Sequence, residues 1–173
     1  MDILVEAIGG EAPADVVKRA LEKGYKVVTA NKALLATQSD ELMGSEYGEA
    51  LFFEASCCGG IPIVSSFEEG LMSNKIEQLL GIFNGTCNYI LTEMSKGGVS
   101  FDEVLKVAQE LGYAEADPTF DIEGIDATHK LCLLGSLAFR EKVDFSKIPV
   151  EGITGLNPED FAWAAENDHV IKL

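Results

Sequence analysis

The stretch that decides the fold runs from Leu4 to Thr29 and reads LVEAIGGEAPADVVKRALEKGYKVVT. Its start predicts one strand, and Tyr25–Thr29 at its end predicts a second. The apolar residues between them recur at helical spacing, with Pro13 in the first turn and Gly24 just past the end. A strand, an amphipathic helix and a strand in so short a stretch predict a βαβ unit with two parallel strands.

The next residues extend this unit toward a ligand-binding edge. Thr29-Ala30-Asn31-Lys32 leads into a short apolar helix, Ala33–Ala36. Lys32 is therefore expected near the carboxyl end of a strand, where open α/β sheets bind ligands. Taken by itself, a solvated lysine is the commoner explanation of such a residue.

The remaining elements follow from periodicity, caps and glycines. Ser100 and Glu103 form a predicted capping box, and Gly112 ends the helix that they begin. Strands are expected over 51–56, 75–83 and at the C-terminal VIKL, and helices over 39–47, 63–73, 86–96, 100–111, 122–139 and 158–167.

Composition describes an ordinary globular chain of strongly acidic character. Of 173 residues, 47% are hydrophobic and 24% charged, and the formal net charge is −16. Such a field disfavours nucleic acid and anionic membrane surfaces as partners. No apolar run approaches the roughly 18 residues of a membrane span, and the start lacks the features of a signal peptide. We expect a cytoplasmic protein.

Cysteine and histidine usage argues against a zinc site. The four cysteines include no C-x-x-C pair, and the only histidines are His129 and His169. We expect reduced thiols, with Cys87 and Cys132 buried in helices and both histidines in packing or surface positions. A redox role for the adjacent Cys57 and Cys58 is a weaker alternative, because adjacent cysteines form only strained disulfides.

The acidic residues are densest just before the long apolar helix. Glu115, Asp117, Asp121, Glu123 and Asp126 precede a single lysine, Lys130. On a helix Asp126 and Lys130 share a face, with the acid first, which is the favourable order. A surface ion pair with Asp121 as a helix cap is the simpler explanation, but carboxylates around one cation can also bind an ammonium group and move a proton. Calcium is disfavoured, since no D-x-D-x-D-G spacing occurs.

Five blocks of sequence, in order, resemble the homoserine dehydrogenase family. They are GGxxPA (9–14), TANKALLA (29–36), FEAS-x-x-GGIPI (53–63), GIFNGTCNYIL (81–91) and LGYAEADPTFDIEGIDATHKL (111–131). The resemblance implies reduction of L-aspartate 4-semialdehyde to L-homoserine with NADPH or NADH, a step toward threonine, methionine and isoleucine.

The resemblance also implies roles for particular residues. Lys130 matches the catalytic proton donor, and Asp126 would orient it. Glu115 matches the residue that binds the substrate ammonium, and Asp121 lines the same site. Lys32 matches a lysine beside both the cofactor and the substrate.

A monovalent-cation site, usually for sodium, is implied in the loop before the Ile-Pro pair. The positions matching its ligands are Glu54, through its carboxylate, and Cys57, Gly59 and Ile61, through main-chain carbonyls. Main-chain ligands tolerate the Cys57-Cys58 pair.

The expected architecture is α/β followed by α+β, a partial Rossmann-like unit followed by a mixed-sheet domain. Residues 1–50 would be the C-terminal part of a NAD(P)-binding domain and 51–173 a truncated substrate and dimerisation domain, whose sheet forms a homodimer in this family. The G-x-G-x-x-G turn that holds the cofactor pyrophosphate is missing. We therefore expect an internal fragment of a longer enzyme that is inactive alone; the alternative is a noncatalytic dimerisation module.

Overall fold

The computed structural model describes residues 2–38, 42 and 48–173. By its internal contacts the chain forms two compact units, one of residues 1–79 and 129–148 and the other of residues 80–128 and 149–173. Each unit is described by itself. The domain boundary near residue 50 is a separate expectation, and it stays a prediction.

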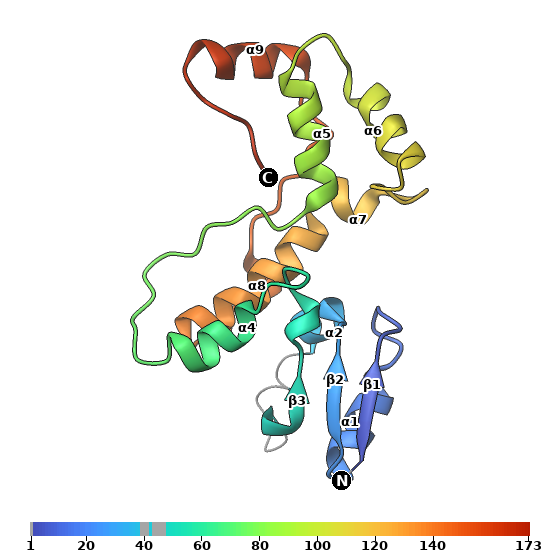
Figure 1. Ribbon diagram of the computed structural model, residues 1–173, viewed down its shortest axis with the longest axis vertical. Coiled ribbons are helices and arrows are strands. Elements are labelled where there is room, and N and C mark those ends of the chain that lie inside the picture. The colour runs from blue at the N-terminus through green and yellow to red at the C-terminus, as the bar shows by residue number, and fades with distance from the viewer. Residues whose placement is uncertain (1, 39–41, 43–47) are drawn as a thin grey trace. The chain divides into compact units, whose positions relative to one another are not determined.

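The first unit is built on a three-stranded parallel sheet in the order β1-β2-β3 (Figure 1). Its elements up to the third strand are β1 (Ile3–Glu6), α1 (Ala14–Glu22), β2 (Lys26–Thr29), α2 (Lys32–Thr37) and β3 (Leu51–Phe52). The predicted βαβ unit and its parallel strands are confirmed. The helix expected over 39–47 lies outside the described residues, apart from Leu42.

Helix α1 covers one face of the sheet because its apolar residues fall on one side. Val17, Ala20 and Leu21 are buried in this helix, as are Val27 of β2 and Leu51 of β3. Gly24 follows the helix with φ +77°, a left-handed conformation that glycine adopts without strain, and lets the chain turn back into β2.

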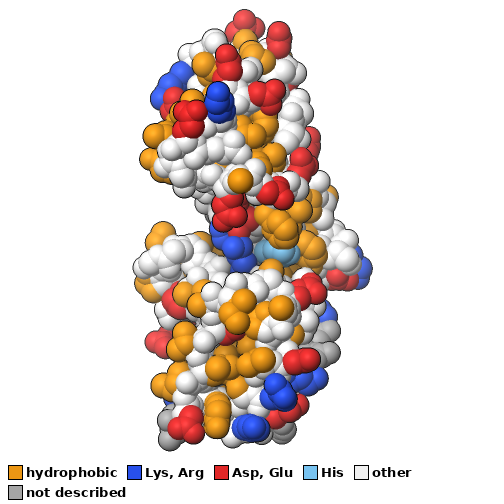
Figure 2. All heavy atoms as spheres, turned by 90° about the vertical axis from the view of Figure 1, so that its right-hand side faces the viewer, with side chains coloured by type: hydrophobic (Ala, Val, Ile, Leu, Met, Phe, Trp, Pro, Cys, Tyr) orange, Lys and Arg blue, Asp and Glu red, His pale blue; other side chains and the backbone are white. Residues whose placement is uncertain are grey.

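The opposite face of the sheet is open and apolar. Val5, Val28 and Phe52 lie opposite one another in the strand register, and each is more than a third exposed. Figure 2 shows a broad group of hydrophobic side chains over the lower part of the molecule, where the strands lie. A parallel sheet normally has both faces covered, so this face is suited to a covering layer.

The segment after β3 departs from the predicted elements. The expected strand over 51–56 ends at Phe52, because Phe53 turns the chain (φ −139°, ψ 25°) into a 3-10 turn, Glu54–Ser56. The expected helix over 63–73 is shorter, with α4 (Ile63–Ser65) continued by a π-helical turn, Ser66–Gly70.

The strand predicted over 75–83 is wrong, and so is the one at the C-terminal VIKL. Both segments are irregular, and within the described residues strands are confined to β1, β2 and β3. A strand requires a hydrogen-bonded neighbour, which an apolar sequence alone does not provide. Leu80 and Ile82 are consequently exposed.

The second unit is helical around one apolar core. Its helices include α5 (Gly85–Ser95), α6 (Phe101–Glu110), α7 (Thr119–Ile122) and α9 (Pro158–Glu166). Ile90, Leu91, Met94, Val104 and Phe161 are among the residues buried in this core. The predicted Ser100–Glu103 capping box is present in both directions, and Asn157 with Asp160 forms a second one at α9.

The long apolar helix is shorter than predicted at its start. Residues 122–139 were expected to form one helix, but α7 ends at Ile122 and α8 (Ile125–Phe139) begins after Gly124. Gly124 has φ +77°, which stops α7 and redirects the chain. No helix formed by the described residues is long and apolar enough to span a membrane.

Candidate functional site

A buried cluster of polar side chains joins the carboxyl ends of β1 and β2. Glu6 ends β1, and it pairs in register with Thr29, which ends β2. The Thr29 hydroxyl donates to one Glu6 carboxylate oxygen at 2.5 Å. The backbone N–H groups of Ile8 and Gly9 donate to the other oxygen at 2.8 and 3.1 Å. Burial acts to raise the pKa of Glu6, but these hydrogen bonds outweigh it and hold the pKa below its ordinary value.

Asn31 connects this cluster to α2 and thereby positions Lys32. Its Nδ2 donates to the Gly10 carbonyl at 2.6 Å, and its Oδ1 caps α2 by accepting from the Leu34 N–H at 3.1 Å. Lys32 follows as the first residue of α2 and is half-buried. Its predicted position beyond the end of a strand is confirmed, and its role stays a prediction.

The loop proposed for a cation is organised by Glu54. The Glu54 carboxylate accepts the backbone N–H groups of Val64 and Ser65 at 2.8 and 2.9 Å, and so caps the start of α4. Burial acts to raise the pKa of Glu54, but these N–H groups hold it below its ordinary value, so the carboxylate is ionised.

The backbone between the other expected cation ligands is tightly turned. Cys58 and Gly59 both have positive φ, +57° and +61°, and the Ile61 N–H donates to the Cys58 carbonyl at 3.2 Å. Ionised carboxylate and carbonyl oxygens are ligands that hard cations take, so the donor chemistry of the loop fits such an ion. Among the described residues, no group of three His, Cys, Asp or Glu side chains is placed to hold a metal.

Two of the predicted site lysines affect the pKa of the same buried thiol, that of Cys57. Cys57 is 1% exposed, and this burial raises the pKa of its thiol, while the positive charges of Lys130 and Lys32 act in the opposite direction. The first unit therefore brings Lys32, Lys130 and Cys57 into one neighbourhood, although they are far apart in sequence. All four cysteines are free thiols, as predicted, and Cys87 and Cys132 are buried.

In the second unit, two of the predicted carboxylates share one amide. Asn84 Nδ2 donates to Asp121 Oδ1 at 2.7 Å and to Asp126 Oδ2 at 2.9 Å. Asp121 lies within α7, so it does not cap the long helix as the simpler explanation supposed. Asp126 is buried in the first turn of α8, and Lys130 follows one helical turn later in the same helix.

Burial and the negative charges of Asp121 and Asp126 raise the pKa of a neighbouring thiol, that of Cys87. Burial, followed by the charges of Asp121 and Asp126, raises the pKa of Cys87 to about 12. The protonated thiol donates to the Asp121 carbonyl, with Sγ and O 3.1 Å apart.

Glu115 is exposed in the turn between α6 and α7, where its carbonyl accepts from the Gln109 side chain at 3.1 Å. The histidines occupy the positions expected of them. His129 is buried with its ring centroid 4.7 Å from that of Phe145, and His169 is exposed near the C-terminus.

Sequence reasoning missed Glu6, Asn31 and Asn84 as parts of these clusters. A usable signal existed for Glu6, since a carboxylate takes an inward position in the alternation of β1. Asn84 lies two residues before the predicted helix over 86–96, close enough to suggest a cap, but its second partnership with Asp126 spans 42 residues and has no local signal.

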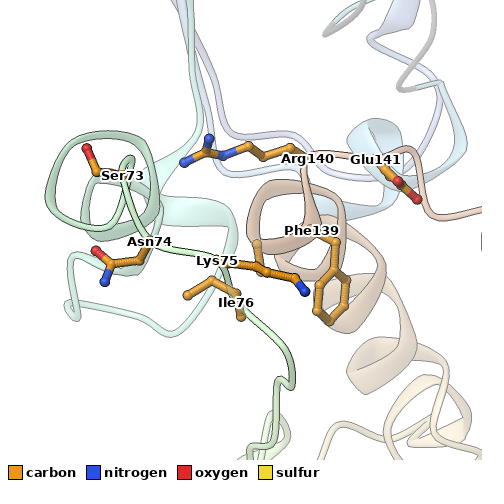
Figure 3. A pocket seen from close by; sticks show the side chains of 8 residues that line it. Ser73, Asn74, Lys75, Ile76, Phe139, Arg140 and Glu141 are labelled. Carbon is orange, nitrogen blue, oxygen red and sulfur yellow. The ribbon is translucent and has the colours of Figure 1, made fainter.

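A pocket of about 530 Å³ in the first unit lies away from the predicted site residues. Figure 3 shows the residues that line it, from the turn after α4 and from the end of α8. Its lining comprises Ser73, Asn74, Lys75, Ile76, Ala138, Phe139, Arg140 and Glu141. It is therefore distinct from the clusters around Lys32 and Cys57.

Two family models, both described as homoserine dehydrogenase, cover most of the chain. Residues 1–47 match the model described as homoserine dehydrogenase, NAD binding domain, and residues 62–173 match the model described as homoserine dehydrogenase. A curated homoserine dehydrogenase of Pseudomonas aeruginosa is 49% identical over 99% of the chain, and one of Helicobacter pylori is 48% identical over all of it. The chain spans about 40% of the length of these relatives.

Solved structures agree in fold. A homoserine dehydrogenase from Thiobacillus denitrificans matches with a TM-score of 0.94 and 50% identity, over all of this chain and 41% of that one. A hyperthermophilic archaeal homoserine dehydrogenase in complex with NADPH matches with a TM-score of 0.78 and 32% identity, over 90% of this chain and 48% of that one.

Proposed function

Because this chain belongs to the homoserine dehydrogenase family, we propose that it contributes to an NAD(P)-dependent oxidoreductase that interconverts L-aspartate 4-semialdehyde and L-homoserine. The observation that carries the proposal is the match of both family models, in order, along one chain. The product would serve threonine, methionine and isoleucine synthesis.

Lys130 is proposed as the proton donor. A bound nicotinamide cofactor would supply the hydride for the aldehyde carbon. As the aldehyde oxygen gains negative charge, the Lys130 ammonium would transfer a proton to it and form the hydroxyl of homoserine. Asp126, one helical turn earlier in α8, would orient the Lys130 ammonium.

The remaining site residues would hold substrate and cofactor. Glu115 would pair with the substrate ammonium, and Asp121 would line the same site. Lys32, fixed at the end of β2 by the Asn31 cap, would lie beside both substrate and nicotinamide. Parallel sheets bind ligands at this edge, which supports the placement of Lys32.

We propose that residues 1–50 are the tail of a cofactor domain and that residues 51–173 belong to the substrate and dimerisation domain. The open apolar row of Val5, Val28 and Phe52 supports the first part, because a complete cofactor domain would cover that face. Hydrogen exchange tests this assignment of residues 1–50. The backbone amides of these strands should lose protection when the preceding sequence is removed.

A homodimer is proposed through the second domain. The exposed Leu80 and Ile82 lie in an irregular segment with apolar side chains to bury. Replacing both by lysine should lower the mass measured by sedimentation from dimer to monomer, and an unchanged mass would contradict this role.

A sodium site is proposed at the Glu54 carboxylate and the carbonyls of Cys57, Gly59 and Ile61. A bound ion would stabilise the turn before α4. Glu54→Gln should remove the dependence of thermal stability on Na⁺, compared with K⁺ and choline at equal ionic strength, and a stability independent of Na⁺ in the unmutated protein would rule the site out.

The activity is tested in the full-length gene product by following homoserine-dependent reduction of NAD⁺ or NADP⁺. Lys130→Ala should lower kcat by about 10²–10⁴-fold, the range that a positioned proton-transfer group supplies. Lys147→Ala, an exposed lysine of the same unit paired with Asp144, is the matched control and should retain activity. Wild-type enzyme without homoserine-dependent turnover would refute the proposal.

A further inference from the structure

Asn84 uses its side-chain amide in two directions at once. It is 4% exposed and is the N-cap of α5, where its Oδ1 accepts from the Cys87 N–H at 2.8 Å. Its two Nδ2 hydrogens point to two different carboxylates, Asp121 at 2.7 Å and Asp126 at 2.9 Å. Both donors and one acceptor position of the amide are therefore engaged.

The cap determines which way the amide faces. If the amide were reversed, Nδ2 would face the Cys87 N–H and Oδ1 would face two carboxylates, which would place donor against donor and acceptor against acceptors. The start of α5 thus orients the NH₂ group toward α7 and α8. A local helix-capping interaction is thereby coupled to the placement of two acidic side chains from other helices.

The shared amide also limits the distance between the two carboxylates. Because both oxygens bond the same nitrogen, they lie within two hydrogen-bond lengths of each other. Like charges this close repel, and a donor placed between them offsets part of that repulsion. The titratable groups near the amide include Asp121 from α7, Asp126 from α8 and Cys87 from α5 itself, and the Cys87 thiol is protonated at neutral pH.

We propose that Asn84 is a positioning residue that holds the Asp121 and Asp126 side chains together, and so places the carboxylate that orients Lys130. This rests on the proposed function, in which both aspartates belong to the substrate site. Asn84 acts through the aspartates and needs no contact with substrate.

Two substitutions in the full-length gene product separate positioning from capping. Asn84→Ser keeps a good N-cap but replaces the two amide donors by one hydroxyl donor on a shorter side chain. Asn84→Asp also keeps the cap but puts a third carboxylate beside the pair, so one of the three should retain a proton at higher pH than in the wild type. Asn157, the N-cap of α9, supplies matched controls as Asn157→Ser and Asn157→Asp, since its side chain caps a helix at the surface.

We expect Asn84→Ser to lower kcat/KM for homoserine by about 10- to 100-fold. Asn84→Asp should shift the acid limb of the pH profile of kcat/KM upward by about one pH unit or more. The two Asn157 variants should stay within about twofold of wild type and keep its acid limb. Asn84→Ser activity equal to that of Asn157→Ser, or an unshifted acid limb in Asn84→Asp, would overturn the proposal.

A second measurement does not depend on turnover. The carboxyl ¹³C resonances of Asp121 and Asp126, assigned by substitution, should titrate at altered pH in Asn84→Ser and as in wild type in Asn157→Ser. If the wild type lacks homoserine-dependent activity, the proposed function fails and these titrations alone decide the pairing. Curves unchanged by Asn84→Ser would overturn it.

Discussion

Gly152→Ala should destabilise the second unit strongly, because no room exists for a methyl group at this position. A Cβ built there would lie 2.7 Å from the Glu123 Cα and 3.1 Å from its carbonyl carbon, and closer still to the Ile122 carbonyl oxygen. Carbon atoms in contact are normally about 3.5–4.0 Å apart, so the overlap approaches 1 Å. The atoms in the way are backbone, which cannot turn aside as a side chain can.

The cost follows from what must move. Separating the two segments strains the packing by about 1–3 kcal/mol. It also weakens the 2.8 Å bond from the Ile153 N–H to the Ile122 carbonyl, which contributes about 1 kcal/mol. We expect a loss of about 3 kcal/mol, with further disturbance of Asp121, which precedes Ile122 in α7.

Urea unfolding followed by the fluorescence of Trp163 measures this loss, since Trp163 lies in α9 of the same unit and is the only tryptophan of the chain. Gly155→Ala is the matched control, because a Cβ there meets nothing within 4 Å and φ is not in the left-handed range. It should change the free energy of unfolding by no more than about 0.5 kcal/mol. Equal urea midpoints for the two variants would show that the close approach at Gly152 is mistaken.

Three further predictions concern other sites. The pKa of Glu6 is lowered in the folded state, so its carboxylate stabilises the fold above the unfolded pKa of about 4.5, and this contribution is lost as pH falls through the lower folded pKa. In acid unfolding, Glu6→Gln should therefore lose less stability than the wild type between those two pH values. An identical loss in the two proteins would contradict this prediction. Arg140 follows α8 with φ +55°, a conformation that costs a non-glycine residue about 1 kcal/mol. Arg140→Gly should therefore raise the free energy of unfolding, and an unchanged or lower value would contradict this expectation. Cys87 is buried and has a pKa of about 12, so it should resist alkylation at pH 8 while the half-buried Cys58 reacts. Mass spectrometry of the labelled peptides measures both reactions, and equal labelling would contradict the burial of Cys87.

The sequence predicted those features that depend on neighbouring residues. The βαβ unit follows from apolar periodicity and from Pro13 and Gly24 at the helix ends. The capping box of α6 follows from Ser100 and Glu103, three residues apart. These signals are reliable because helix caps and turns are set by interactions within a few residues.

Sequence reasoning failed where a segment depends on distant partners. Residues 75–83 are rich in apolar side chains, as many strands are, yet without a neighbouring strand their backbone groups have no ladder to join. The break between α7 and α8 had a local signal, Gly124 with its positive φ, which the prediction of one helix over 122–139 overlooked.

The sequence by itself determined the family, the types of residue proposed for the site and the placement of Lys32 beyond a strand. Only the tertiary structure decided how those residues are held. Glu6 bonds Thr29 across 23 positions, and Asn84 bonds Asp126 across 42. Such bonds form because folding removes the groups from water and leaves them only one another as partners, and no local pattern records which partner each will meet.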